Sequence, residues 1–79
     1  MAAKFTHTQG QYLAFIYWYT RLHRQAPAEK DIQLHFQVTP PSVHQMILTL
    51  EKHGLISRVP WEARSIRVLV PQAELPELE

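Results

Sequence analysis

Residues 39–54, TPPSVHQMILTLEKHG, contain the start, the repeat and the end of a helix. Thr39 can cap the first turn with its hydroxyl, Pro40 suits the first helical position, and Gly54 suits the left-handed residue that ends a helix. Apolar side chains recur at helical spacing and are predicted to face the core: Val43, Met46, Ile47 and Leu50. We therefore predict a helix over residues 39–53 with a polar outer face.

The outer face of this predicted helix carries the candidate DNA contacts. In the major groove, glutamine pairs with an adenine edge, and serine or threonine pairs with several partners. Such polar side chains near a helix N-terminus suit a recognition helix. The candidates on or beside this face are Thr39, Pro41, Ser42, His44, Gln45, Thr49 and Lys52. The alternative is an ordinary amphipathic helix whose polar face is only solvated.

The composition of the chain limits the possible classes of protein. The chain has 79 residues, of which 46% are hydrophobic and 19% charged. This length and composition predict one small globular domain without room for a catalytic lobe, so we do not expect an enzyme. No apolar run is long enough to span a membrane, and residues 1–5 lack the pattern of a signal peptide. The absence of cysteine excludes disulfides and cysteine-based zinc sites and fits a reducing compartment. We therefore expect a cytoplasmic protein.

Charge is distributed unevenly along the chain. The net charge is only +1, but eight Lys and Arg residues against four acids give residues 1–70 a net charge of +4. This mildly basic part is compatible with DNA binding, and we predict that it forms the domain. Residues 71–79 contain three glutamates, two prolines and no basic residue, so we predict an acidic, proline-containing C-terminal tail. Its apolar residues, Leu75 and Leu78, suit packing across a partner; the alternative is a mobile tail.

The first helix is predicted from Thr6 to about Arg24. Thr6 and Gln9 have the spacing of a capping box. Apolar residues then recur every three or four positions: Tyr12, Leu13, Phe15, Ile16, Tyr19 and Leu22. Tyr17 and Trp18 lie outside the narrowest apolar stripe. For Trp18 we weigh two explanations equally, which are core packing against the C-terminal strands and contact with a second copy of the chain.

A short second helix is predicted over residues 28–36. Ala28 is a poor N-cap, so we expect this helix to fray at its start, although two acids in its first turn suit the helix dipole. Residues 37–39 form a turn that is short enough to hold the second and third helices against each other. We therefore predict that the second and third helices form a helix-turn-helix.

After Gly54 the pattern changes to that of strands. Residues 55–59 and 65–70 are predicted strands, the second with Ile66, Val68 and Val70 on one face and Arg67 and Leu69 on the other. The predicted fold is α+β: a winged helix-turn-helix with three helices followed by a β-hairpin wing over residues 59–64.

Three arginines around the wing are candidate contacts with DNA phosphates: Arg58, Arg64 and Arg67. Phosphate contacts position a protein on DNA without reading its sequence. For each arginine taken alone, a solvated strand residue is the alternative. Their joint position around the predicted wing favours the DNA contact.

Across residues 5–69 the chain resembles the N-terminal DNA-binding domain of the LexA repressor family. The matching landmarks are Phe5-Thr6 with Gln9, Leu13, Phe15-Ile16, Pro27, Ile32, residues 39–43, residues 50–56 and residues 64–69. The resemblance implies a winged helix that reads the major groove with Thr39, Pro41, Ser42, His44 and Gln45. Gln33, Gln37 and Leu48 depart from the family pattern. The family's self-cleaving serine–lysine peptidase domain, which also dimerises the repressor, has no counterpart in these 79 residues, so we expect no autoproteolysis.

Five histidines raise the question of a metal site. His7, His23, His35, His44 and His53 form no pair at three- or four-residue spacing. We expect neither a metal nor a cofactor. Ser42, Ser57 and Ser65 also lie in no recognisable nucleophile motif.

Together these features predict sequence-specific binding of double-stranded DNA by a small transcriptional regulator. The helix at residues 39–53 would enter the major groove and the wing at residues 59–64 would contact the backbone. We expect a homodimer that forms through the Tyr17 and Trp18 surface. The alternative is a winged helix that binds another protein through Trp61, Leu48 and the aromatic residues of the first helix.

Overall fold

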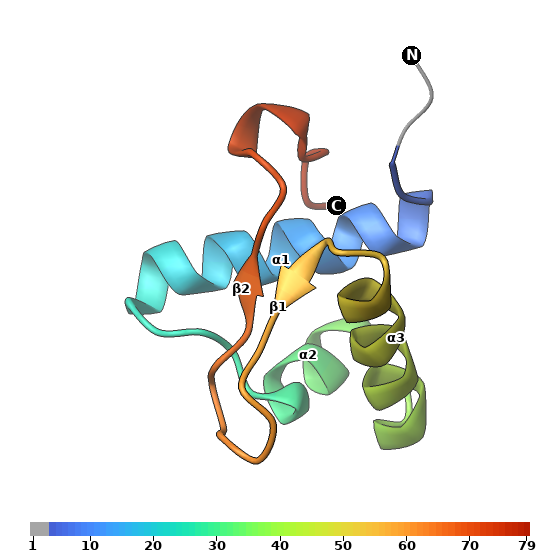
Figure 1. Ribbon diagram of the computed structural model, residues 1–79, viewed down its shortest axis with the longest axis vertical. Helices are drawn as coiled ribbons and strands as arrows, with labels where there is room; N and C mark the ends of the chain where they lie inside the picture. The colour runs from blue at the N-terminus through green and yellow to red at the C-terminus, as the bar shows by residue number, and fades with distance from the viewer. Residues whose placement is uncertain (1–3) are drawn as a thin grey trace.

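The computed structural model describes residues 4–79 (Figure 1). Residues 1–3 lie outside the described part. They belong to the domain predicted over residues 1–70 and to the segment 1–5 that lacks a signal-peptide pattern. The helices and strands follow the predicted order: α1 (His7–His23), α2 (Glu29–Phe36), α3 (Pro40–Lys52), β1 (Ile56–Ser57) and β2 (Arg67–Val68). The short 3-10 helix η1 (Gln72–Glu74) within the tail was not predicted. The predicted winged helix with an α+β fold is confirmed. No helix in residues 4–79 is both long enough and apolar enough to cross a membrane.

The capping box predicted at the start of α1 is present. Thr6 Oγ1 accepts a hydrogen bond from the N–H of Gln9 at 3.1 Å, and Gln9 Oε1 accepts one from the N–H of Thr6 at 3.0 Å. These two bonds satisfy two backbone donors that the first helical turn leaves free. The helix ends at Arg24, whose φ of 57° is left-handed.

Both predicted ends of α3 are confirmed. Thr39 Oγ1 accepts a hydrogen bond from the N–H of Ser42 at 3.3 Å. At the other end, Gly54 has a φ of 72°, its N–H donates to the carbonyl of Glu51 at 3.0 Å, and the N–H of Leu55 donates to that of Leu50 at 3.0 Å. This pair of bonds is a Schellman motif, which requires the left-handed conformation that glycine adopts most readily.

The start of α2 has a hydrogen bond that the sequence reasoning missed. Ala28 has no side chain that can cap the helix, but the carboxylate of Asp31 accepts a hydrogen bond from the N–H of Ala28 at 2.8 Å. This bond opposes the fraying expected from a poor N-cap. The turn to α3 is as short as predicted, with Gln37 in a left-handed conformation at a φ of 54°.

All three helices and the hairpin contribute to one core. The fully buried side chains include Leu13, Ile16, Ile32, Val43, Ile47, Leu50 and Ile56. At its edge, Tyr12 of α1 stacks on Phe36 of α2 with ring centroids 4.3 Å apart. Met46 is only half-buried. Leu22 breaks the predicted apolar pattern of α1, because it is 78% exposed on the last turn, where the helix extends past the rest of the domain (Figure 1).

The two strands are shorter than predicted. They pair antiparallel with Ile56 opposite Val68 and Ser57 opposite Arg67, and one further bond joins the N–H of Leu69 to the carbonyl of Leu55 at 2.9 Å. Residues 59–65 form a folded loop instead, in which Oγ of Ser65 accepts from the N–H of Val59 at 2.9 Å and the N–H of Glu62 donates to the carbonyl of Val59 at 3.1 Å. The predicted alternation is confirmed, since Ile66 and Val70 are buried and Val68 half-buried, whereas Arg67 and Leu69 are exposed.

Residues 71–79 pack on α1 of their own chain. Figure 1 shows this segment returning over the helix, and Leu75 packs against the core cluster. Gln11, only 6% exposed, donates from Nε2 to the carbonyl of Glu77 at 2.9 Å and accepts at Oε1 from the N–H of Glu79 at 2.8 Å. Neither expectation for the tail, a partner contact or mobility, included this intramolecular packing.

Gly10 allows the tail to approach α1. A Cβ atom at this position would lie 3.0 Å from Cε1 of Phe5 and 3.0 Å from Cγ of Pro76. A larger side chain would therefore have to displace one of these two rings. The contact explains a glycine within an apolar helix, where glycine is otherwise unfavourable.

We predict that Gln11→Ala lowers the free energy of unfolding by about 1–3 kcal/mol, because both hydrogen bonds to the tail are lost. Urea denaturation followed by circular dichroism measures this change. Gln25→Ala is the matched control, since Gln25 is exposed and has no side-chain hydrogen bond within residues 4–79. Equal free energies for the two variants would contradict the role of Gln11.

Candidate nucleic-acid interface

The outer face of α3 has the composition predicted for it. Pro41, Ser42, His44, Gln45 and Lys52 are exposed. Thr49 and Leu48 are half-buried. A shallow hollow along the helix is lined by Gln9, Pro41, Ser42, Gln45, Met46 and Thr49. The helix therefore presents polar side chains next to a surface that a second molecule can enter, and Gln9 of α1 extends this surface beyond the predicted residues.

The polar side chains on this face differ in how free they are to bind a ligand. The hydroxyl of Thr39 caps α3 and lies 2.9 Å from Oγ of Ser42. The hydroxyl of Thr49 donates to the carbonyl of Gln45 at 2.9 Å. Within residues 4–79, the side-chain amide of Gln45 has no hydrogen-bond partner, so both its donor and its acceptor are available to a ligand.

A carboxylate lies beside the N-terminal half of α3. Nδ1 of His44 is 3.3 Å from both Oε1 and Oε2 of Glu29, which belongs to the first turn of α2. This contact orients the imidazole ring and places negative charge beside the candidate interface. The sequence reasoning missed it, because the two residues are 15 positions apart and neither lies in a motif that pairs them.

Two of the three predicted phosphate contacts are bound within the chain. Nε of Arg58 is 3.1 Å from Oε1 of Glu51, and the Arg58 side chain is only 19% exposed. Nη1 of Arg64 is 3.2 Å from Oδ2 of Asp31 and donates to the carbonyl of Ala26 at 3.1 Å. The same nitrogen donates to the hydroxyl of Tyr19 at 3.3 Å, and this bond raises the pKa of Arg64 above its ordinary value.

The third arginine lies apart from the other two. Arg67 is exposed on β2 and lines a small hollow with Tyr17, Thr20 and Arg21 of α1. The three arginines therefore do not form the joint cluster that their positions around the wing suggested. Among the described residues, the cationic side chains without an ion pair are Arg21, Arg24, Lys30, Lys52 and Arg67. Of these, Lys52 lies on α3.

Of the two aromatic side chains on the outer surface of α1, Tyr17 contacts the tail and Trp18 is partly exposed to solvent. The hydroxyl of Tyr17 donates to Oε1 of Gln72 at 2.8 Å and accepts from Nη1 of Arg21 at 3.2 Å. Trp18 meets the Tyr17 ring edge to face, at 5.1 Å between centroids, and remains 39% exposed. Trp18 therefore does not belong to the core.

In residues 4–79 no three His, Asp or Glu side chains come together as a possible metal site.

Sequence comparison links this geometry to known proteins. The chain is 36% identical over 72 residues to the LexA repressor of Thermosipho melanesiensis, an alignment that covers 91% of this chain and 36% of the relative. The predicted resemblance to the LexA repressor family is confirmed. A second LexA repressor, from Thermosipho africanus, is 39% identical over 64 residues, covering 81% of this chain and 32% of the relative. The LexA-like chain thus spans about a third of the length of these relatives. No protein-family model matches it.

We predict that Arg64→Ala lowers the melting temperature more than Arg67→Ala does. The first substitution removes an ion pair and two hydrogen bonds that join the wing to α1, α2 and the segment between them, whereas Arg67 has no ion pair among the described residues. Thermal unfolding followed by circular dichroism compares the two variants. Equal melting temperatures would show that Arg64 does not stabilise the wing.

Proposed function

We propose that this chain binds double-stranded DNA in a sequence-specific manner as the DNA-binding part of a transcriptional regulator. The observation that carries the proposal is the free side-chain amide of Gln45 on the exposed face of the second helix of a helix-turn-helix. An α-helix fits the major groove, and glutamine can bond to both N6 and N7 of adenine there. The similarity to two proteins named LexA repressor supports a regulatory role.

The side chains around Gln45 suit direct reading of base edges. Ser42 and Gln45 offer hydrogen-bonding groups, and Pro41 offers an apolar surface of the kind that packs against a thymine methyl group. His44 lies at the edge of this face, held by Glu29. We propose that Thr39 and Thr49 support the site, because both hydroxyls already bond within α3.

We propose that Lys52 and Arg67 contact phosphates. Both are exposed and have no ion pair within residues 4–79. For Arg58 and Arg64 we propose a different role, because each would have to leave or share its carboxylate to bind a phosphate. In this proposal they hold the wing in position, and with only two proposed phosphate contacts the phosphate contribution to affinity is modest.

We further propose a homodimer that forms through the α1 surface containing Trp18 and Leu22. These residues are 39% and 78% exposed and lie one helical turn apart, so they form one apolar surface. Tyr17 contributes less than we expected from the sequence, because its hydroxyl is bound to the tail. A single DNA-binding module buries only a small interface, and pairing on two half-sites is the usual way to increase affinity.

We predict that Gln45→Ala weakens binding to the preferred site by about 1–3 kcal/mol and changes binding to random DNA little, because a base contact is lost. Fluorescence anisotropy with a duplex selected from a random pool, measured at two salt concentrations, tests this. In Lys52→Ala, affinity for both DNAs should fall alike and the salt slope should decrease by about one. Equal losses on both DNAs for Gln45→Ala would contradict base reading. An affinity of the wild type that does not depend on salt would contradict DNA binding and favour the protein-binding alternative.

We predict that Trp18→Glu makes the protein monomeric, because a charge cannot be buried at an apolar contact without a partner. Sedimentation velocity at micromolar protein concentrations measures the oligomeric state. Leu34→Glu is the matched control, since Leu34 is 63% exposed on α2 and lies outside the proposed interface. A monomeric wild type would refute the dimer, and a Trp18→Glu variant that stays dimeric would place the interface elsewhere.

A further inference from the structure

His44 and Glu29 join two helices at the edge of the candidate interface. Nδ1 of His44 on α3 lies 3.3 Å from both carboxylate oxygens of Glu29 on α2. Both side chains are partly open to solvent, with exposed fractions of 54% for His44 and 41% for Glu29. A titratable ring therefore stands on the surface that the proposed function assigns to DNA, with a carboxylate at one of its two nitrogens.

The carboxylate determines which ring nitrogen of a neutral His44 carries the proton. An ionised carboxylate only accepts hydrogen bonds, so Nδ1 must donate to Glu29. A neutral imidazole has a single N–H, which leaves Nε2 as an acceptor. Phosphate oxygens are acceptors too, so a neutral His44 that is bound to Glu29 cannot donate to DNA. Protonation adds a second N–H and turns Nε2 into a donor.

The charges around the His44 ring leave no free cation for a phosphate. A cleft between α3 and the hairpin is lined by His44 and Glu29 and, across from them, by Arg58, Glu62 and the fully exposed Trp61. The guanidinium group of Arg58 pairs with Glu51, and Glu62 has no ion pair within residues 4–79. On α3 itself, the positions one turn away from His44 hold only proline, isoleucine and leucine. While His44 is neutral, the two carboxylates that line the cleft therefore repel phosphates.

We propose that DNA binding is coupled to the uptake of one proton by His44, which contacts a phosphate only in its protonated state. A recognition helix lies in the major groove, whose two edges are phosphate backbones. Protonated His44 can donate Nδ1–H to Glu29 and Nε2–H to a phosphate oxygen, and its charge offsets that of the carboxylate. DNA adds negative charge beside the ring, so His44 holds its proton more tightly in the complex than in the free protein. This inference rests on the proposed DNA-binding function.

We predict that the affinity for DNA rises as the pH falls. A proton that is held more tightly in the complex favours the complex below the ordinary pKa of histidine, about 6.5, and this gain is lost as the pH rises above it. A single linked proton changes affinity by at most about tenfold per pH unit, so we expect a decrease of roughly three- to tenfold from pH 6 to pH 8. Fluorescence anisotropy with the duplex selected from a random pool, at constant ionic strength, measures this change.

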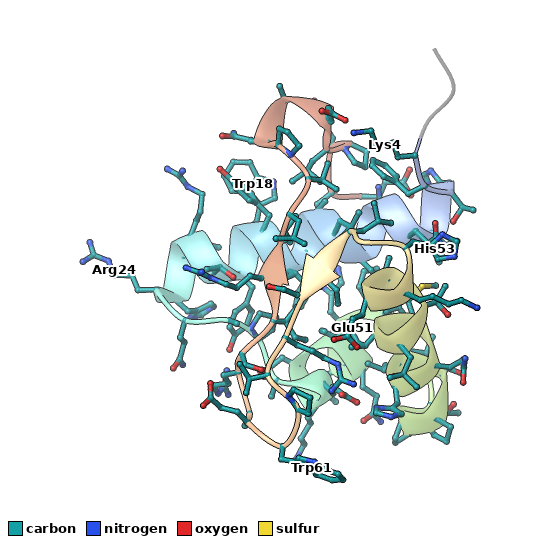
Figure 2. The ribbon with its side chains drawn as sticks, in the orientation of Figure 1. Lys4, Trp18, Arg24, Glu51, His53 and Trp61 are labelled. Carbon is teal, nitrogen blue, oxygen red and sulfur yellow. The ribbon has the colours of Figure 1, made fainter. Side chains whose placement is uncertain are left out.

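Three variants separate His44 from the other histidines. His44→Gln keeps a hydrogen-bonding side chain without the titration, so its affinity should change less than about twofold over the same pH range. His53→Gln is the matched control and should behave like the wild type, because His53 is exposed and lies at the end of α3 away from the wing tip that Trp61 marks (Figure 2). Glu29→Gln frees the neutral ring to carry its proton on Nε2, so this variant should bind DNA roughly three- to tenfold more tightly than the wild type at pH 8.

Calorimetry measures the proton directly. Titration of the wild type with the duplex at pH 7, in two buffers that differ in enthalpy of ionisation, should show uptake of a fraction of one proton per chain. His53→Gln should take up as much, whereas His44→Gln should take up less. A His44 side chain with a purely structural role would leave this number unchanged.

Three results would overturn the inference. If wild-type affinity does not change between pH 6 and pH 8 while Gln45→Ala still loses specificity, the proton coupling fails and the proposed function stands. If His44→Gln keeps the full pH dependence, another group takes up the proton. If the wild type binds no DNA at either pH, the inference and the proposed function fail together.

Discussion

The burial of one side of α3 determines what the other side can do. Val43, Ile47 and Leu50 are fully buried in the cluster that joins all three helices and the hairpin. Rotating the helix would expose these side chains at a cost of about 1.5–3 kcal/mol each, a large part of the stability of so small a domain. The direction of the opposite face is therefore fixed, and with it the exposure of Gln45. A reading helix needs this rigidity because base edges are distinguished by the positions of single hydrogen-bonding groups.

The positive charge around the wing is largely used within the fold. Arg58 and Arg64 pair with Glu51 and Asp31, and both pairs join the hairpin region to helices. Strongly basic DNA-binding domains obtain much of their affinity from phosphates, with little regard to sequence. In the proposed function, a domain whose wing arginines are paired would depend more on contacts with bases and on pairing of two copies. The apolar surfaces at Trp18 and Trp61 are consistent with this dependence, because aromatic side chains contribute contact area without charge.

The C-terminal segment also contributes to the packing of the domain. A domain of this size buries little surface, so additional packing matters for its stability. Residues 71–79 add Leu75 to the core cluster and satisfy both groups of the buried Gln11 amide. This arrangement requires a glycine at position 10, because Gly10 leaves room for Pro76 against the helix. The acidic tail is thus held on α1 (Figure 1).

The local features of this protein follow from the sequence by itself. The capping box at Thr6, the N-cap at Thr39, the end of α3 at Gly54 and the alternation from Ile66 to Val70 all depend on residues a few positions apart, so their patterns are visible along the chain. The order of the elements, the buried side of α3 and the resemblance to the LexA family follow from the same patterns.

The tertiary structure decided the contacts between distant residues. Glu29 approaches His44, Asp31 holds Arg64, and Gln11 binds the backbone of the tail. Hydrogen bonds of Ser65 within the loop accompany the short strands, ion pairs bind Arg58 and Arg64 within the domain, and the end of α1 leaves Leu22 exposed. The physical reason is that caps and periodicity act over one or two turns, whereas an ion pair forms only where the folded backbone brings two distant side chains within about 4 Å of each other.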